Sequence, residues 1–181
     1  RTATGDTAPN RTITSAAVPT PLLTPTAIYL DVANDRLFVA SSGNDAILIY
    51  DNVSALSGET NPNRVLAGVN TAITDPTGVT VDTTRNRLYV SDSDNQILIF
   101  ANAGTTNGDI APVGTISGAS TTLNNPGALF VDPVEDRLYV ANTASNSILV
   151  FEDASTGNGN VAPDRTLAGV STQLSQPRAL C

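Results

Sequence analysis

A unit of roughly 50 residues repeats along this chain, and it limits the possible folds more than any other feature. The repeat is clearest in three kinds of residue that return at nearly constant spacing: Pro25, Pro76, Pro126 and Pro177; Asp31, Asp82 and Asp132; Arg36, Arg87 and Arg137. Such a unit is a small element that buries its apolar surface against its neighbours. Residues that recur in every unit therefore belong first to the frame, and residues that differ between units are better candidates for function.

Each unit has the pattern of four short β-strands. In the second unit, β-branched and apolar residues favour strands at 78–82, 87–91, 96–100 and 113–117, separated by polar turns. Nothing in the unit has a helical period. Four such strands make one small twisted sheet, which cannot bury both apolar faces alone. Radial stacking of these sheets, with the first strand innermost, predicts an all-β fold of β-propeller blades. A sandwich needs no near-identical repeats, and a parallel β-helix has a much shorter coil.

The repeat predicts a single propeller region over residues 1–181. Its complete four-stranded blades are expected at about 26–68, about 77–118 and about 127–169, with an extra N-terminal strand at 11–14 and the start of a fourth blade at 177–181. Since propellers have about four to eight blades, these cannot close a ring. Either the blades are part of a larger ring, or copies of the chain assemble to complete one. Unpaired terminal strands would also favour a homo-oligomer or a filament.

Three segments of the unit resemble a known propeller repeat. Their pattern is Pro-x-[Gly/Ala]-[Val/Leu]-x-Val-Asp, then Arg-Leu-Tyr-Val-[Ala/Ser], then Asn-x-Ile-Leu-[Ile/Val]-Phe, and it covers residues 22–168. This pattern resembles the NHL repeat and is similar to the YVTN-type blades of bacterial extracellular propellers. The resemblance implies a propeller fold. It implies no single function, because such blades serve in protein-binding and RNA-binding modules, lactone or ester hydrolases, an amidating lyase and cell-surface proteins.

Composition argues against several classes of partner. The formal net charge is −8, and the nine basic residues are arginines spread along the repeat. Nucleic-acid binding needs a concentrated basic surface, so no nucleic-acid partner is expected. No apolar run approaches the roughly 20 residues of a membrane span. The single cysteine, Cys181, permits no internal disulfide. An acidic, lysine-free surface rich in Thr, Ser and Asn suits a secreted protein, in an extracellular, periplasmic or cell-surface location.

The recurring aspartates are one candidate for chemistry. Asp31, Asp82 and Asp132 fall where the first strand of each blade turns into the second, and they could ring a channel mouth and bind Ca²⁺. A feature present in every blade favours a structural role instead. Each aspartate would then cap its own turn, or pair with the arginine five residues further on.

The loops after the second strands differ between blades, at 41–45, 92–95 and 141–146. Variable loops on a repeated frame are where recognition usually resides. Asp92 and Asp94 are the most anionic pair there, and together with Asn142 they are the candidate ligand-binding residues, for Ca²⁺ or a polyol. The alternative is ordinary solvated loop polarity. Apart from this possible Ca²⁺, no metal and no other cofactor is predicted.

Aromatic residues also return at fixed strand positions. Phe38, Tyr89 and Tyr139 share one position, and Tyr50, Phe100 and Phe151 share another. Regular placement favours packing between neighbouring blades over a row of sugar-stacking rings.

The leading functional hypothesis is a non-enzymatic extracellular or cell-surface propeller that serves as a binding or assembly scaffold. Without histidine there is no Ser-His-Asp triad and no histidine metal ligand, and no catalytic residue is predicted. The first strands also offer an apolar or neutral lining, as at Val79 and Val81. The alternative is a lactonase-like hydrolase or lyase with a central divalent ion, whose catalytic residues lie largely outside this stretch. Proteins, including copies of the chain itself, are the expected partners.

Overall fold

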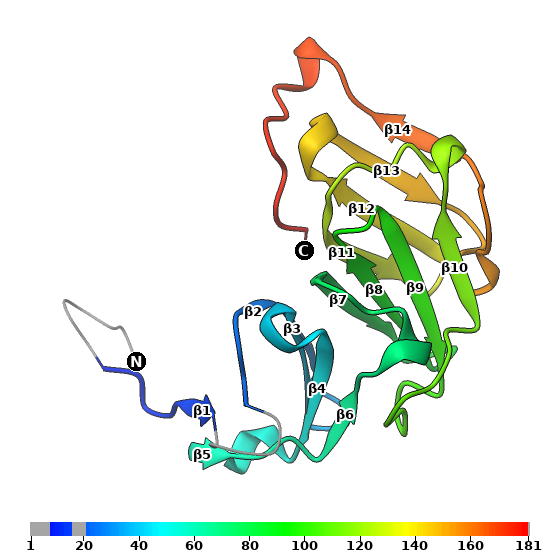
Figure 1. The fold of residues 1–181 in the computed structure, drawn as a ribbon. Helices are drawn as coiled ribbons and strands as arrows, with labels where there is room; N and C mark the ends of the chain where they lie inside the picture. The colour runs from blue at the N-terminus through cyan, green and yellow to red at the C-terminus, as the bar shows by residue number, and fades with distance from the viewer. Residues whose placement is uncertain (1–7, 16–20, 181) are drawn as a thin grey trace.

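The computed structural model describes residues 8–15 and 21–180, and this part of the chain is all-β, as predicted. Three four-stranded antiparallel sheets follow one another, and in each the strands pair in sequence order (Figure 1). The helices of the described residues are 3-10 turns of three residues, and none is long and apolar enough to cross a membrane.

The strand bounds repeat from sheet to sheet. The first sheet contains β2 (Pro25–Asp31), β3 (Arg36–Ser41), β4 (Ala46–Asp51) and β6 (Arg64–Leu66). The second contains β7 (Pro76–Asp82), β8 (Arg87–Asp92), β9 (Gln96–Ala101) and β10 (Gly114–Ser117). The third contains β11 (Pro126–Asp132), β12 (Arg137–Asn142), β13 (Ser147–Phe151) and β14 (Arg165–Leu167). A two-stranded parallel sheet joins β1 (Ile13–Ser15) to β5 (Gly58–Thr60).

The 3-10 turns lie in the loops between these strands. They are η1 (Ser42–Asn44), η2 (Val53–Ala55), η3 (Val69–Thr71), η4 (Ala119–Thr121), η5 (Thr143–Ser145), η6 (Ala154–Thr156) and η7 (Val170–Thr172).

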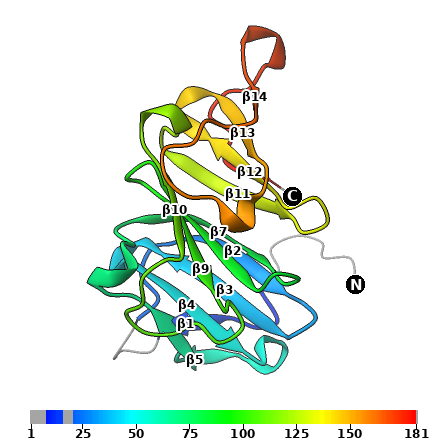
Figure 2. The same ribbon diagram turned by 90° about the vertical axis from the view of Figure 1, so that its right-hand side faces the viewer.

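The sheets stack face to face as propeller blades. Their first strands, β2, β7 and β11, lie side by side, while β6, β10 and β14 form the outer edges (Figures 1 and 2). The described residues form no closed ring. We call the sheets blades 1 to 3, and in each blade the front face is the one toward the preceding blade and the rear face the one toward the following blade.

Two apolar cores fill the spaces between the blades. At the first interface, the rear face of blade 1 packs on the front face of blade 2, with core residues that include Phe38, Ile47, Leu66, Val79, Val81 and Phe100. The second interface repeats this one unit later, with Tyr89, Ile97, Ile116, Leu129, Val131 and Phe151. Complete burial of a large apolar side chain contributes about 1.5–3 kcal/mol, so these two interfaces are the main source of stability. At both interfaces the recurring aromatic residues pack between blades, as predicted.

Tyr89 is the largest polar exception in these cores. Its ring is fully buried, and its hydroxyl has no hydrogen-bond partner among the described residues. Burial, followed by the nearby carboxylates of Asp136 and Asp82, raises the pKa of this hydroxyl. The phenol therefore stays protonated over the whole range in which ordinary tyrosines are neutral.

A backbone hydrogen bond at the outer edge links each blade to the next. The amide of Gly108 donates to the carbonyl of Val65 at 2.7 Å, and that of Gly159 donates to Thr115 at 2.7 Å. Both glycines have positive φ, near +80°, which glycine adopts without steric cost. The same bond occurs a third time, because Gly58 donates to the carbonyl of Thr12 at 2.6 Å.

β1 therefore occupies the place of a fourth strand from a blade preceding blade 1. Its register on β5 joins Ile13 to Gly58 in parallel, as Leu66 is joined to Gly108 and Ile116 to Gly159. Ile13 also packs on the front face of blade 1. The short β5 was not predicted, because three residues in a Gly-containing loop carry no alternation to detect.

The chain after blade 3 lies in the position of a further inner strand, although residues 173–180 form no strand. The amide of Gln176 donates to Asn146 Oδ1 at 2.8 Å, just as the amide of Asn125 donates to Asn95 Oδ1 at 2.6 Å one unit earlier. Leu180 lies beside Phe130 and lines a small pocket with it. Residues 176–180 thus follow the path that 125–129 take relative to blade 2.

Candidate functional site

A pocket of about 270 Å³ opens where the inner strands of the blades begin. Its wall contains residues from every inner strand and from the η5 loop: Thr26, Thr77, Asn125, Pro126, Gly127, Ala128, Thr143 and Arg178. We call it the axial pocket, because it lies on the side of the molecule where β2, β7 and β11 come together. The variable loops that follow the second strands lie at this same end of the blades.

Threonine hydroxyls on the pocket wall also hold neighbouring blades together. Thr26 Oγ1 donates to the carbonyl of Pro76 at 2.6 Å, and Thr77 Oγ1 donates to that of Pro126 at 2.5 Å. Thr143 Oγ1 donates to the carbonyl of Pro177 at 2.8 Å. Each of these contacts joins one unit to the next, so the pocket wall is fixed by the same bonds that join the inner strands.

Four of the pocket residues occupy one equivalent position of the repeat, and the residue at that position differs between units. Thr26, Thr77, Gly127 and Arg178 each follow a recurring proline by one residue. The first two are alike, Gly127 removes the side chain, and Arg178 replaces it with a cation. None of these residues was predicted as a site residue. A signal was present in the sequence, since this position differs between units on an otherwise regular inner strand.

The predicted site residue Asp92 is buried and anchors its own blade. Its carboxylate accepts hydrogen bonds from the amide and the hydroxyl of Thr74 at 2.9 and 2.8 Å, and from the amides of Asp75 and Asp94, each at 3.2 Å. Asp94 joins this group, because its carboxylate accepts from Thr74 Oγ1 at 3.0 Å. The two predicted carboxylates therefore share Thr74 and hold the loop that leads into β7.

Asn142 occupies the equivalent position in the next blade. Its Oδ1 accepts from the amide of Asn124 at 2.7 Å, and its Nδ2 donates to the carbonyl of Thr122 at 2.9 Å. Ser41 takes the same role in blade 1 through its contacts with Leu23. The three equivalent side chains each anchor the loop ahead of their own first strand. The axial pocket is lined by Thr143, the neighbour of Asn142, and not by the three predicted residues themselves.

No group of three or more His, Cys, Asp or Glu side chains that could hold a metal ion occurs in the described part of the chain. Calcium binding at Asp92, Asp94 and Asn142 remains a prediction.

The opposite end of the blades carries the recurring aspartates, which cap their own turns. Asp82 Oδ1 accepts from the amides of Thr84 and Arg85 at 2.8 and 3.0 Å. Asp31 accepts from the amide of Asn34 at 3.2 Å, and Asp132 from that of Val134 at 2.9 Å. This agrees with the structural role that the sequence favoured.

The recurring arginines take other partners than the turn aspartates. Arg36 pairs with Asp51 at 2.6 Å, and Arg64 reaches the same oxygen at 2.8 Å. Burial alone would raise the pKa of Asp51, but the two guanidinium groups hold it below its ordinary value. Arg137 lies 3.3 Å from Glu152 and 3.4 Å from Glu135 in the preceding turn. In blades 1 and 3 an acidic partner thus comes from the end of the third strand or just beyond it, which spacing along the sequence could not reveal.

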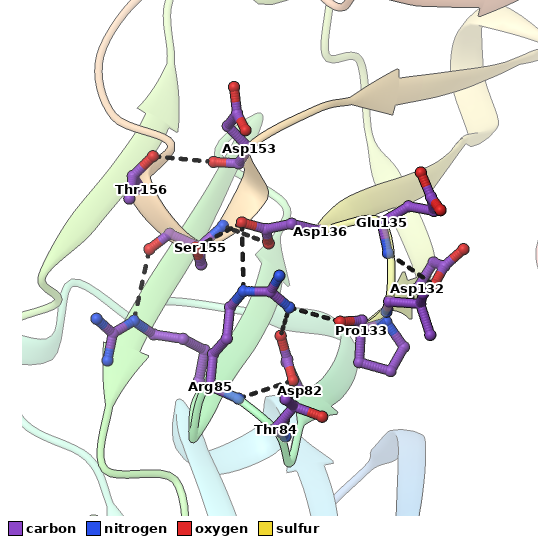
Figure 3. A network of polar contacts seen from close by, with 12 residues as sticks. Asp82, Thr84, Arg85, Asp132, Pro133, Glu135, Asp136, Asp153, Ser155 and Thr156 are labelled. Atoms are coloured by element: carbon purple, nitrogen blue, oxygen red, sulfur yellow. Dashed lines mark hydrogen bonds and ion pairs between the residues drawn. The ribbon is translucent and has the colours of Figure 1, made fainter.

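Arg85 links blades 2 and 3 at this end (Figure 3). Its Nη1 donates to Asp82 Oδ2 at 3.0 Å and to the carbonyl of Pro133 at 2.6 Å, while its Nε lies 3.5 Å from Asp136 Oδ2. The hydrogen bond to Asp82, opposed by desolvation and aided by the charge of Asp136, raises the pKa of Arg85. These contacts join the turn of blade 2 to the turn of blade 3, so the network stabilises the blade interface.

Comparison with known proteins identifies the architecture. Among solved structures, hydrazine synthase of Kuenenia stuttgartiensis, a β-propeller-containing protein, aligns with a TM-score of 0.62. The chain has a β-propeller-like fold. The alignment covers 90% of this chain and 40% of the hydrazine synthase chain, at 16% identity, which supports the fold alone. No family model and no curated protein matches the sequence, so the NHL or YVTN resemblance is not confirmed.

Proposed function

We propose that this protein is a non-enzymatic, extracellular scaffold that assembles head to tail with copies of itself. In such an assembly, the rear face of blade 3 of one copy meets the front face of blade 1 of the next. The contact is heterologous, so it generates either a closed ring or a filament. The acidic, lysine-free composition supports the extracellular location.

The observation that carries the proposal is the pair of open end faces. Ile28 and Leu30 on the front of blade 1 are 67% and 49% exposed, whereas their equivalents Val79 and Val81 in blade 2 are both 4% exposed. On the rear of blade 3, Leu167 is 56% exposed, whereas its equivalents Leu66 and Ile116 are fully buried. Positions that both internal interfaces bury are uncovered at the two end faces of the described residues, which makes these faces contact surfaces for further blades or for a second copy of the chain.

The two ends are also complementary at the level of strands. Residues 176–180 follow the path of an inner strand on the rear of blade 3, and β1 takes the place of an outer strand in front of blade 1. Brought together, one copy would supply a segment in the first-strand position and the next copy a strand in the fourth-strand position, while the second and third positions between them would stay empty. The incoming inner strand would cover Ile28 and Leu30, while β1 keeps its bond to Gly58.

The chemistry of the axial pocket supports binding rather than catalysis. The residues that line it include no carboxylate, thiol or phenol, and the threonine hydroxyls donate to backbone carbonyls. Activated nucleophiles need a neighbouring base, which this lining does not supply. The activity of the hydrazine synthase neighbour is not carried over, because likeness at 16% identity concerns the fold.

Sedimentation velocity over a wide range of protein concentration tests the assembly. We expect the sedimentation coefficient of the protein to rise with concentration, and Leu167→Asp or Ile28→Asp to abolish that rise. Val170→Asp is the matched control, because Val170 is 97% exposed in a loop. A monomer at every concentration would overturn the proposal, as would loss of association in the control.

Mixing the two single variants separates head-to-tail assembly from other contacts. The Ile28→Asp variant keeps an intact rear face, and the Leu167→Asp variant keeps an intact front face. An equimolar mixture should therefore form heterodimers that cannot grow further, although each variant alone is monomeric. Failure of the mixture to form any complex would contradict the head-to-tail arrangement.

A further inference from the structure

We propose that the axial pocket binds a small polyhydroxylated carboxylate of the uronic-acid class. This inference goes beyond the proposed function, because the pocket lies at the inner strand ends and does not depend on assembly through the end faces.

The threonine oxygens of the wall act as acceptors toward the pocket. A hydroxyl has one proton to donate, and in Thr26, Thr77 and Thr143 its shortest hydrogen bond is to a carbonyl of the next unit. Longer contacts join Thr26 Oγ1 to the Ala40 carbonyl at 3.4 Å and Thr77 Oγ1 to Ser91 Oγ at 3.1 Å. What remains available is the oxygen lone pairs. A ligand that pairs with them must supply donors, as the hydroxyl groups of a sugar do.

Arg178 adds a positive charge to this acceptor-rich wall. Its Nη2 donates to Gln176 Oε1 at 3.3 Å, which occupies one of the five N–H donors of the guanidinium. The side chain is exposed, and no carboxylate is among the residues that line the pocket with it. A planar guanidinium matches a carboxylate with two parallel hydrogen bonds. The same charge disfavours a metal cation or an ammonium group.

Gly127 makes room for the ligand. The equivalent position carries a side chain in Thr26, Thr77 and Arg178, and here it carries none. A Cβ on Gly127 would lie 3.0 Å from Thr143 Oγ1, tight against one of the acceptor oxygens. The pocket volume of about 270 Å³ falls just below the range of about 300–1,000 Å³ typical of drug-sized ligands, so a single sugar ring is the appropriate size.

Titration of the isotopically labelled protein with glucuronate, followed by amide chemical shifts, tests the inference. Glucose, which lacks the carboxylate, and acetate, which lacks the hydroxyl groups, are the matched probes. We expect glucuronate to bind more tightly than either, with shifts centred on the amides of Thr26, Thr77 and Gly127. Equal binding of acetate and glucuronate would overturn the polyol part of the inference, and equal binding of glucose would overturn the anion part.

Two variants assign the roles within the pocket. Arg178→Gln should weaken glucuronate binding by about ten-fold and leave glucose binding unchanged, since a hydrogen bond to a charged group is lost. Arg165→Gln is the control, because Arg165 pairs with Glu152 on the outer strand at 3.0 Å. Gly127→Ala should weaken both sugars by filling the pocket. Equal effects of the two arginine variants, or shifts spread away from the pocket, would refute the site.

Discussion

Replacing Leu66 and Leu167 by alanine compares one repeat position in two environments. Leu66 is fully buried between blades 1 and 2, and its equivalent Leu167 is 56% exposed on the rear face of blade 3. If a following sheet is what buries this position, the same substitution must have very different costs at the two sites.

The expected magnitudes follow from burial. Leu66→Ala removes a side chain from a packed core and should cost about 2–5 kcal/mol of unfolding free energy, because it leaves a cavity. The side chain of Leu167 is less than half buried, so it contributes less than half of the transfer free energy of about 1.5–3 kcal/mol, and Leu167→Ala should cost about 1 kcal/mol. For a chain of this size each kcal/mol corresponds to roughly 2–4 °C in the melting temperature, so the two variants should melt at clearly separated temperatures.

Urea unfolding at low protein concentration, where the chain is monomeric, is the appropriate assay. The slopes of the unfolding free energy against urea should agree, so that the midpoints report stability alone. Ile116→Ala provides a second buried copy of the position and should behave as Leu66→Ala does. Equal losses for Leu66→Ala and Leu167→Ala would refute the argument that the blades bury this position in succession. At high concentration the cost of Leu167→Ala should rise if the end face is an interface.

Three further predictions concern single residues. Asp92→Asn should destabilise the protein by about 1 kcal/mol and Asp92→Ala by about 3 kcal/mol in urea unfolding, because the amide oxygen of Asn can still accept from Thr74 as Asn142 does from Asn124. If Asp92 and Asp94 bind calcium, Ca²⁺ should raise the melting temperature of the unmutated protein, and Asp94→Asn should abolish that rise. The pKa of Tyr89 is raised in the folded protein, so its contribution to stability is complete below about pH 10 and is lost above it, where the phenol of the unfolded chain ionises. Tyr89→Phe should reduce this alkaline loss of stability, and it should stabilise the protein by about 1 kcal/mol because it removes an unpartnered buried hydroxyl. An unchanged dependence of stability on pH would contradict the assignment. Gly78→Ala should destabilise the protein by about 1–3 kcal/mol, because its Cβ would lie 2.3 Å from the carbonyl oxygen of Gly127 and would force β7 and β11 apart; a thermal melt equal to that of the unmutated protein would disprove this contact.

Local sequence patterns predicted the repeated frame well, because the frame depends on local chemistry. Continuous apolar runs such as Ile97–Phe100 mark strands that are buried on both sides, since each face of the sheet packs on a neighbouring blade. Asp82 was predicted to cap its turn, and it does so through amides only two and three residues away. Both features are decided within a few residues, and the repeat supplies independent copies of the same evidence.

Long-range pairing could not be predicted in the same way. The partner of Arg36 is Asp51 rather than the nearer Asp31, because β3 and β4 are antiparallel and bring these side chains together. Asp92 carries a carboxylate of the kind that binds ligands, but in the structure this carboxylate accepts hydrogen bonds from Thr74 and Asp75. The axial pocket combines residues from four units, so no single window of the sequence contains it.

The bond from Gly58, Gly108 and Gly159 to a carbonyl one unit earlier has a consequence for how such a gene can change. Gly58, Gly108 and Gly159 each bond to the outer edge of the preceding blade, so a segment that contains both partners of one bond begins in one sheet and ends in the next. When a whole repeat of about 50 residues is duplicated or lost, wherever in the repeat the exchange begins, each glycine that follows a complete unit still faces a backbone carbonyl of that unit. An insertion of part of a repeat would leave one amide unmatched. Recombination can therefore lengthen or shorten this protein in whole units and keep this edge bond in each blade.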